Sequence, residues 1–219
     1  MKSKNKLQSL IPVLFFCCVS SVSFSQILKD VFSDSETPLT YLGVDFSKAK
    51  LLSGGNPDEI RNKLYTAINY VVVNEPKKYD IKGAFHKSVV NTDIGPVNAR
   101  NEKANINEIL STNSTDFNRF KENDITTIVK GLNLPGKQGV GLLFVMEAMR
   151  KVDKNADASI WVTFIDMKSK KVLMTERMVS KTSGGIGFRN YWASTIDNLI
   201  QSIKKNKYQE WQSKFSSAK

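Results

Sequence analysis

Three predicted strands fill the stretch Val140–Val179, VGLLFVMEAMRKVDKNADASIWVTFIDMKSKKVLMTERMV. Its first ten residues, Val140–Met149, are almost entirely apolar, which is typical of a central strand covered on both faces. Ser159–Asp166 and Val172–Val179 follow as two further strand candidates. The connection between these two, MKSKK, is short enough for a hairpin, so they are predicted to be antiparallel.

Helical patterns lie on both sides of this stretch. Upstream, Asn56 is a good N-cap and Pro57 suits the first helical position, and the apolar spacing that follows predicts a helix ending before Pro76. A second helix is predicted to begin near Asn123. Downstream, apolar residues recur at helical spacing over Phe188–Lys207, which predicts a long final helix.

The remaining segments complete the predicted order of elements. Thr40–Phe46 has strand composition. Phe85–Val97 is interpreted as a strand interrupted by Gly95-Pro96, and Asn101–Phe120 as a loop with one helical turn. The order strand, helix, strand, helix, three strands, helix predicts an α+β fold, with a mixed β-sheet, a C-terminal antiparallel hairpin and helices packed on the sheet.

The first 25 residues have the three-part pattern of a secretory signal peptide. A lysine-rich start precedes the apolar run Leu10–Val19, which is too short to span a bilayer, and small residues at Ser23 and Ser25 predict cleavage before Gln26. The alternative is a lipoprotein acylated at Cys17 or Cys18. It is weaker, because a bulky phenylalanine precedes Cys17 where lipoprotein signals have a small residue.

Cleavage before Gln26 would leave 219 − 25 = 194 residues, predicted as a polar arm (26–38) followed by one domain (39–219). Both cysteines of the chain would be removed with the signal. The mature chain would then form no disulfide and hold no thiolate metal site or cysteine nucleophile. We predict no metal and no cofactor.

The chain is strongly basic, with 32 Lys and Arg against 21 Asp and Glu, or +11. Without the three lysines of the signal the balance is +8. Export and the lack of a nucleic-acid motif disfavour nucleic acid as a partner. Acidic proteins, lipid headgroups or envelope polysaccharide fit better, and the alternative is that the excess charge only maintains solubility.

A glycine-rich turn precedes the last predicted helix and raises the question of anion binding. The N-terminus of a helix attracts anions through its free N–H groups and its dipole. The spacing, G-G-x-G, matches neither the P-loop nor the dinucleotide-binding pattern, so we favour a simple turn from strand to helix. If an anion does bind, we expect it at Lys181, Gly184, Gly185, Gly187 and Arg189.

Candidate catalytic residues are few. His86 is the only histidine and is expected to be an ordinary strand residue, and no G-x-S-x-G elbow is present. A carboxylate-based hydrolase would use Glu147, or Asp45 with Asp166. The simpler interpretation places Glu147 on a half-exposed strand and the two aspartates at strand ends. We therefore predict no catalytic residue.

The C-terminal segment KKNKYQEWQSKF combines lysines with large aromatic side chains. Such a pattern marks some membrane-surface helices, so Trp211, Phe215, Lys204 and Lys205 are candidate contacts with a partner or a membrane. The alternative is that the aromatic residues dock the C-terminus back onto the domain.

Three segments resemble uncharacterised secreted proteins of Gram-negative envelopes: GVDFSKAKL (43–51), IWVTFIDMKSKKVL (160–173) and SGGIGFRNYWASTIDNLI (183–200). The order of strands and helices is more distantly similar to modules of the curli-secretion lipoprotein and TolB amino-terminal type. Those modules act through protein contacts, so the resemblance implies an accessory role.

We therefore expect a non-enzymatic envelope protein that acts as a protein-binding or assembly accessory module. Its location would be the periplasm, the periplasmic face of the outer membrane, or the exterior. The first alternative is a small-ligand or anion-binding protein that uses the glycine turn, and the second is the carboxylate-based hydrolase. The sequence leaves the oligomeric state open.

Overall fold

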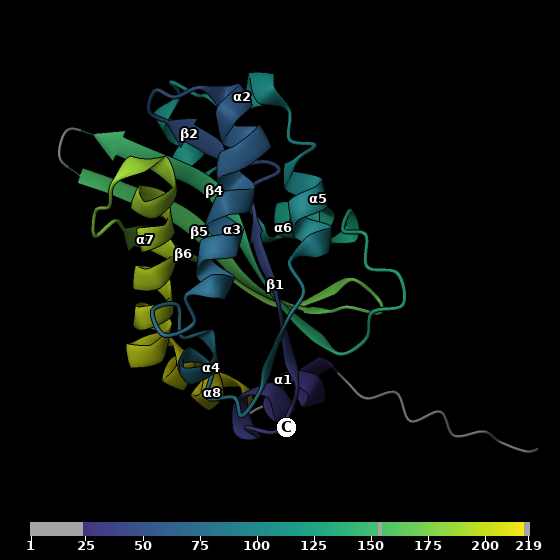
Figure 1. Cartoon of the computed structure of the whole chain (residues 1–219). Coiled ribbons are helices and arrows are strands. Elements are labelled where there is room, and N and C mark those ends of the chain that lie inside the picture. Colours follow the sequence, from purple (N-terminus) through teal and green to yellow (C-terminus); the bar gives the residue numbers. More distant parts are fainter. Residues whose placement is uncertain (1–23, 153–154, 217–219) are drawn as a thin grey trace, which may run out of the picture.

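The computed structural model describes residues 24–152 and 155–216. Within these residues a mixed six-stranded sheet carries helices on both faces, which confirms the predicted α+β class (Figure 1). The path across the sheet is β3 (Val90–Thr92), β1 (Leu39–Asp45), β4 (Val140–Val152), β5 (Asn155–Asp166) and β6 (Lys171–Lys181), with β2 (Lys50–Leu52) paired to the far end of β4.

The sheet is parallel on one side of β4 and antiparallel on the other. β1 runs parallel to both β3 and β4, whereas β4, β5 and β6 form an antiparallel meander. The predicted C-terminal hairpin is thus confirmed. β4 and β5 continue beyond the apolar residues that marked them, because strand pairing also satisfies the backbone of polar residues such as Arg150 and Asp157.

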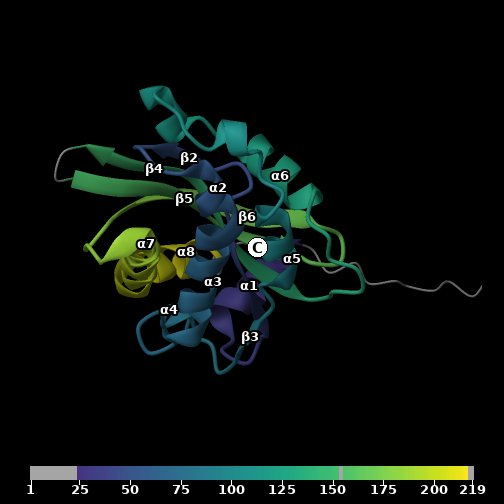
Figure 2. The same cartoon turned by 45° about the horizontal axis from the view of Figure 1, so that its top comes forward.

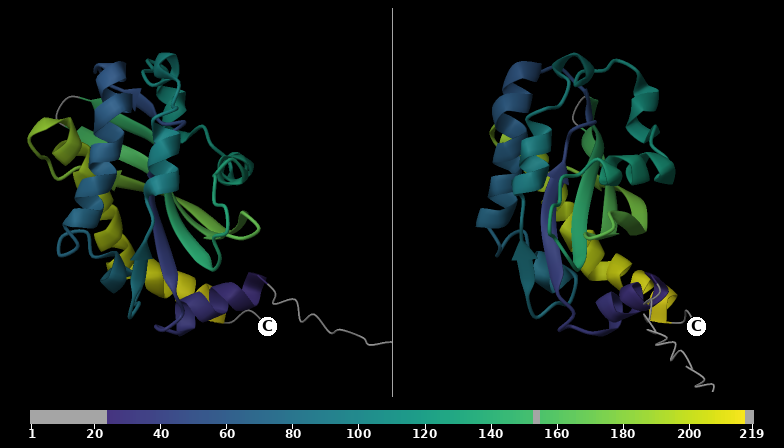
Figure 3. Two further views of the ribbon diagram at one scale, coloured as in Figure 1. Left: turned by 45° about the vertical axis from the view of Figure 1, so that its right-hand side comes forward. Right: turned by 90° about the vertical axis from the view of Figure 1, so that its right-hand side faces the viewer.

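Helices cover the two faces of the sheet unequally. One face holds α3 (Tyr65–Asn74), α7 (Gly187–Ser202), α1 (Phe24–Ser33) and α8 (Tyr208–Ser216), and these pack with the sheet into the larger core. The other face is covered by α6 (Glu122–Lys130), whose apolar side contacts a smaller core. Figures 2 and 3 show α6 on the opposite side of the sheet from α3 and α7.

The upstream helix begins as predicted. Asn56 Oδ1 accepts hydrogen bonds from the N–H groups of Asp58 and Glu59, which caps α2 (Pro57–Glu59). The chain continues through a wider π-helical turn, η1 (Ile60–Leu64), into α3. The downstream helix likewise continues past its predicted end, through η4 (Ile203–Lys207) into α8.

The middle of the chain differs from its prediction. Only Val90–Thr92 of the segment Phe85–Val97 is a strand; α4 (Ile81–Ala84) precedes it, and Gly95-Pro96 begins α5 (Gly95–Asn101) instead of interrupting a strand. Proline is favoured in the first turn of a helix, where its missing N–H is not needed. The loop that follows contains two 3₁₀ turns, η2 (Ile106–Glu108) and η3 (Ser114–Asn118).

The segment predicted as a polar arm, residues 26–38, instead contributes to the core. Leu28, Val31 and Phe32 of α1 are buried, at a spacing that places them on one side of the helix. α1 packs beside α8, so two segments near opposite ends of the chain are neighbours (Figure 1). Apart from Phe24 and Ser25, which begin α1, the predicted signal peptide lies outside the described residues, including both cysteines.

Candidate functional site

The glycine turn between β6 and α7 has a fixed shape. Its glycines adopt positive φ angles, of +95° at Gly184 and +141° at Gly185, which side-chain-bearing residues rarely adopt. A Cβ on Gly185 would lie 2.8 Å from the carbonyl carbon of Asn190, so the turn also approaches α7 closely. Ser194 anchors the turn: its Oγ accepts from the N–H of Ser183 and lies 2.7 Å from the Oγ of Thr182.

α7 begins at Gly187 without a side-chain cap. Ile186 occupies the N-cap position, and its aliphatic side chain makes no capping hydrogen bond to the first N–H groups of the helix. The side chain of Ile186 is 94% exposed. The turn therefore presents one aliphatic side chain and the uncapped start of a helix to the surroundings.

A hollow of about 310 Å³ lies between this turn and the loop after β2. Its walls are aromatic: Tyr191 and Phe188 both pack edge-on against Trp192, with ring centroids 5.2 and 6.2 Å apart. One lysine also lines it, Lys151, whose Nζ lies 5.4 Å from the centroid of the Tyr191 ring. The remaining lining residues are Ser53, Gly54, Gly185 and Gly187.

Two further hollows adjoin the first. One shares Ser53 and Gly54 with it and extends along Leu52 to Leu110. The other shares Gly187 and Phe188 and extends between α7 and the α2–α3 region, where Ile186, Arg189 and Asn190 face Glu59, Leu64 and Ala67. We call the three together the turn groove. The starts of α2 and α7 lie at the same end of the molecule (Figure 1).

The residues predicted to hold an anion are only partly brought together. Gly185, Gly187 and Arg189 line the turn groove, and Arg189 Nε donates to Asn190 Oδ1. Lys181 instead lines a separate hollow at the end of β6, and Gly184 lines neither that hollow nor the turn groove. The cation beside the aromatic hollow is Lys151. The sequence signal for it was weak, since it is one polar residue at the end of a long strand.

The expected contact surface at the C-terminus is only partly exposed. Trp211 is 2% exposed, and its indole N–H donates a 2.6 Å hydrogen bond to Glu176 Oε2. Phe215 stacks on Phe32 of α1, with centroids 5.4 Å apart. Trp211 is therefore closed to a partner or membrane in this conformation, and both rings dock α8 onto the domain. Lys204 forms an ion pair with Asp80, and Lys205 is exposed.

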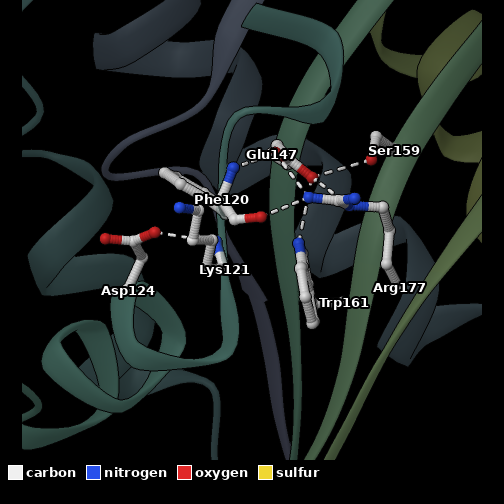
Figure 4. Close-up of polar contacts among 7 residues, drawn as sticks. All are labelled: Phe120, Lys121, Asp124, Glu147, Ser159, Trp161 and Arg177. Carbon is white, nitrogen blue, oxygen red and sulfur yellow. Dashed lines mark hydrogen bonds and ion pairs between the residues drawn. The ribbon is translucent and has the colours of Figure 1, made fainter.

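Glu147 is fully buried, so its predicted place on a half-exposed strand face is wrong. It lies at a β-bulge, where the pairing of β4 with β5 shifts register between Met146 and Ala148. Its carboxylate accepts hydrogen bonds from several donors on different elements (Figure 4). These donors are the Phe120 N–H, Ser159 Oγ at 2.9 Å, Trp161 Nε1 at 3.0 Å and Arg177 Nε at 2.8 Å.

The other candidate carboxylates have structural partners. Asp45 ends β1 as expected: its Oδ1 accepts the Ser47 N–H, and its Oδ2 lies 3.4 Å from Arg100 Nε. Asp166 accepts the Ser169 N–H in the β5–β6 hairpin. None of the three, Glu147 included, lines the turn groove. Glu147 and Asp45 instead neutralise arginines on the face of the sheet that α6 covers.

His86 does not lie on a strand, which corrects that prediction. It follows α4 in a turn with φ +49°, and its ring stacks on Tyr208 at 4.2 Å between centroids. Across residues 24–152 and 155–216 no group of three His, Cys, Asp or Glu side chains could hold a metal ion. In the same ranges, no helix has the length and apolar character needed to cross a membrane.

Comparison with known proteins leaves the family open. No protein-family model matches the chain, and no curated protein matches it.

Proposed function

We propose that the chain is an exported, non-enzymatic binding module that holds another envelope protein at the turn groove. The observation that carries this proposal is the position of Ile186, a 94% exposed aliphatic side chain that lines the hollow adjoining the aromatic one. Single exposed apolar residues are common, but one placed beside a concave aromatic surface has the form of a contact site.

The fixed shape of the turn supports this proposal. The hydrogen bonds from Ser183 to Ser194 and from Gly184 to Thr182 hold the turn before any partner arrives. A pre-organised surface loses less conformational entropy on binding, so more of the contact energy becomes affinity. The export part of the proposal is supported by the signal-like pattern of residues 1–25.

Site-specific photocrosslinking in the native host tests the proposal. A photoreactive residue at position 186 should give one or two defined adducts with envelope proteins. Val89 is a matched control, because it is also an exposed aliphatic residue (61%) and precedes β3 at the opposite end of the sheet. Absence of adducts from position 186, or the same adducts from both positions, would contradict the proposal.

A second candidate is the binding of a small anion at the same place. It is favoured by the uncapped N-terminus of α7, which lies beside Lys151 in a hollow of about 310 Å³. Millimolar inorganic phosphate should then raise the Tm of the wild-type chain, and Lys151→Ala should reduce that rise. An unchanged Tm would exclude phosphate as the ligand.

A further inference from the structure

The turn groove is elongated. Its three hollows share walls in pairs, so they extend from Leu110 through Ser53–Gly54 and Phe188 to Asn190. Each hollow is shallow and open to solvent. A shallow, elongated surface of this kind suits an extended polypeptide segment better than a compact small molecule, which binds in a more enclosed cavity.

The central hollow is built to receive an apolar side chain. Trp192 is buried and forms its floor, and the rings of Phe188 and Tyr191 are fixed edge-on against it. Rigid aromatic walls give contact area at a low cost in side-chain entropy. An aliphatic or aromatic side chain of the bound segment would pack on these rings, near Ile186 of the turn.

The charges around the groove favour an acidic partner. Lys151 and Arg189 line the groove, and within the described residues neither forms an ion pair with a carboxylate. Among the described lining residues, Glu59 is the one carboxylate. Without the three lysines of the predicted signal, the chain carries a net charge of +8. Carboxylates of a partner would therefore meet complementary charge at Lys151 in the central hollow and at Arg189 in the hollow beside it.

We propose that the turn groove binds an extended protein segment in which an apolar side chain is flanked by acidic residues. The apolar side chain enters the hollow between Phe188, Tyr191 and Trp192, and the flanking carboxylates contact Lys151 and Arg189. This inference rests on the proposed function and adds the chemistry of the partner segment to it.

Peptide binding to the purified chain tests the inference by fluorescence anisotropy. The probe is a labelled dodecapeptide with a central Phe-Leu pair flanked on both sides by Glu and Ser. One control peptide has Lys in place of each Glu, and the other has Ser in place of Phe-Leu. The matched protein variant is Lys151→Glu with Arg189→Glu, two surface changes that leave the core intact.

The acidic peptide should bind, and both control peptides should bind at least about tenfold more weakly. The double variant should bind the acidic peptide about tenfold more weakly than wild type does, and it should bind the lysine peptide more tightly. Equal binding of the acidic and lysine peptides, or no binding of the acidic peptide at about 1 mM, would overturn the inference. Crosslinking at position 186 separates the two claims, because adducts there support the proposed function even if the peptides fail.

Discussion

The guanidinium of Arg177 on β6 lies 2.8 Å from the carboxylate of Glu147 on β4, across the intervening strand β5. The same guanidinium donates to the carbonyl oxygen of Phe120, and Glu147 accepts the N–H of Phe120. The carboxylate and the guanidinium therefore both hold the backbone of Phe120, just before α6, against the sheet. Since Glu147 has a full set of hydrogen-bond donors, we assign this pair a structural role.

Replacing Glu147 by glutamine should destabilise the fold by about 3 kcal/mol, because the change removes the countercharge of a partly buried arginine. The side chain keeps its shape, so the loss reports on charge and hydrogen bonding. Urea unfolding of wild type and variant measures the difference. The exposed pair Lys48–Glu108 is the control, and Lys48→Met should lower the free energy of unfolding by less than about 1 kcal/mol. Equal losses in the two variants would contradict the structural role of Glu147.

Trp211→Ala should destabilise the fold by about 3–5 kcal/mol, since a large side chain would be removed from the core. Lys205 is exposed, so Lys205→Ala should change the free energy of unfolding by no more than about 0.5 kcal/mol from the wild-type value. Thermal or urea unfolding distinguishes the two. A Trp211→Ala chain of wild-type stability that has lost its partner would instead show that Trp211 is a binding residue.

Gly185→Ala should cost about 2 kcal/mol, because the added Cβ would meet the backbone of Asn190 at 2.8 Å in a strained φ region. Gly54→Ala is the matched control across the central hollow, since a Cβ there meets nothing within 4 Å. Urea unfolding measures the free energy of unfolding of both variants, and Gly185→Ala should be the less stable of the two. Similar values would mean that the turn does not need its close approach to α7.

Acid should remove the contribution that Glu176 makes to the free energy of unfolding. Burial would raise the pKa of its carboxyl, but hydrogen bonds from Trp211 and Lys207 outweigh this and lower the pKa below its usual value. The lowered pKa means that the folded state favours the charged form of Glu176. Its contribution to stability is therefore present above the usual pKa of the carboxyl, about 4.3, and is lost as pH falls through the pKa in the folded state. The stability difference between wild type and Glu176→Gln should therefore shrink from pH 7 to pH 3.5 in urea unfolding. A difference independent of pH would contradict this.

Segments with one strong pattern could be predicted from the sequence. The apolar run Val140–Met149, the hairpin after it and the Asn56-Pro57 helix start each depend on local chemistry, and each is confirmed. The segments around Gly95-Pro96 and α1 were mispredicted. Glycine with proline fits a helix start as well as a break, and the apolar residues of α1 lie among polar ones.

The candidate site was harder to predict than the fold. The sequence singled out the glycine turn, but the hollow beside it also needs Ser53, Gly54 and Lys151, which tertiary structure brings to the turn from distant segments. Glu147 was noticed as a charge in an apolar strand. Its burial could not be predicted, because it depends on a bulge and on Arg177, thirty residues away.

The most direct test of the account is recovery of partners from the native host with two tagged variants, Ile186→Asp and Val89→Asp. Both place a charge at an exposed aliphatic position, so neither should affect folding. We predict that Ile186→Asp loses the envelope proteins that co-purify with wild type, while Val89→Asp retains them. Equal recovery with both variants would contradict the claim that the turn groove is the binding surface.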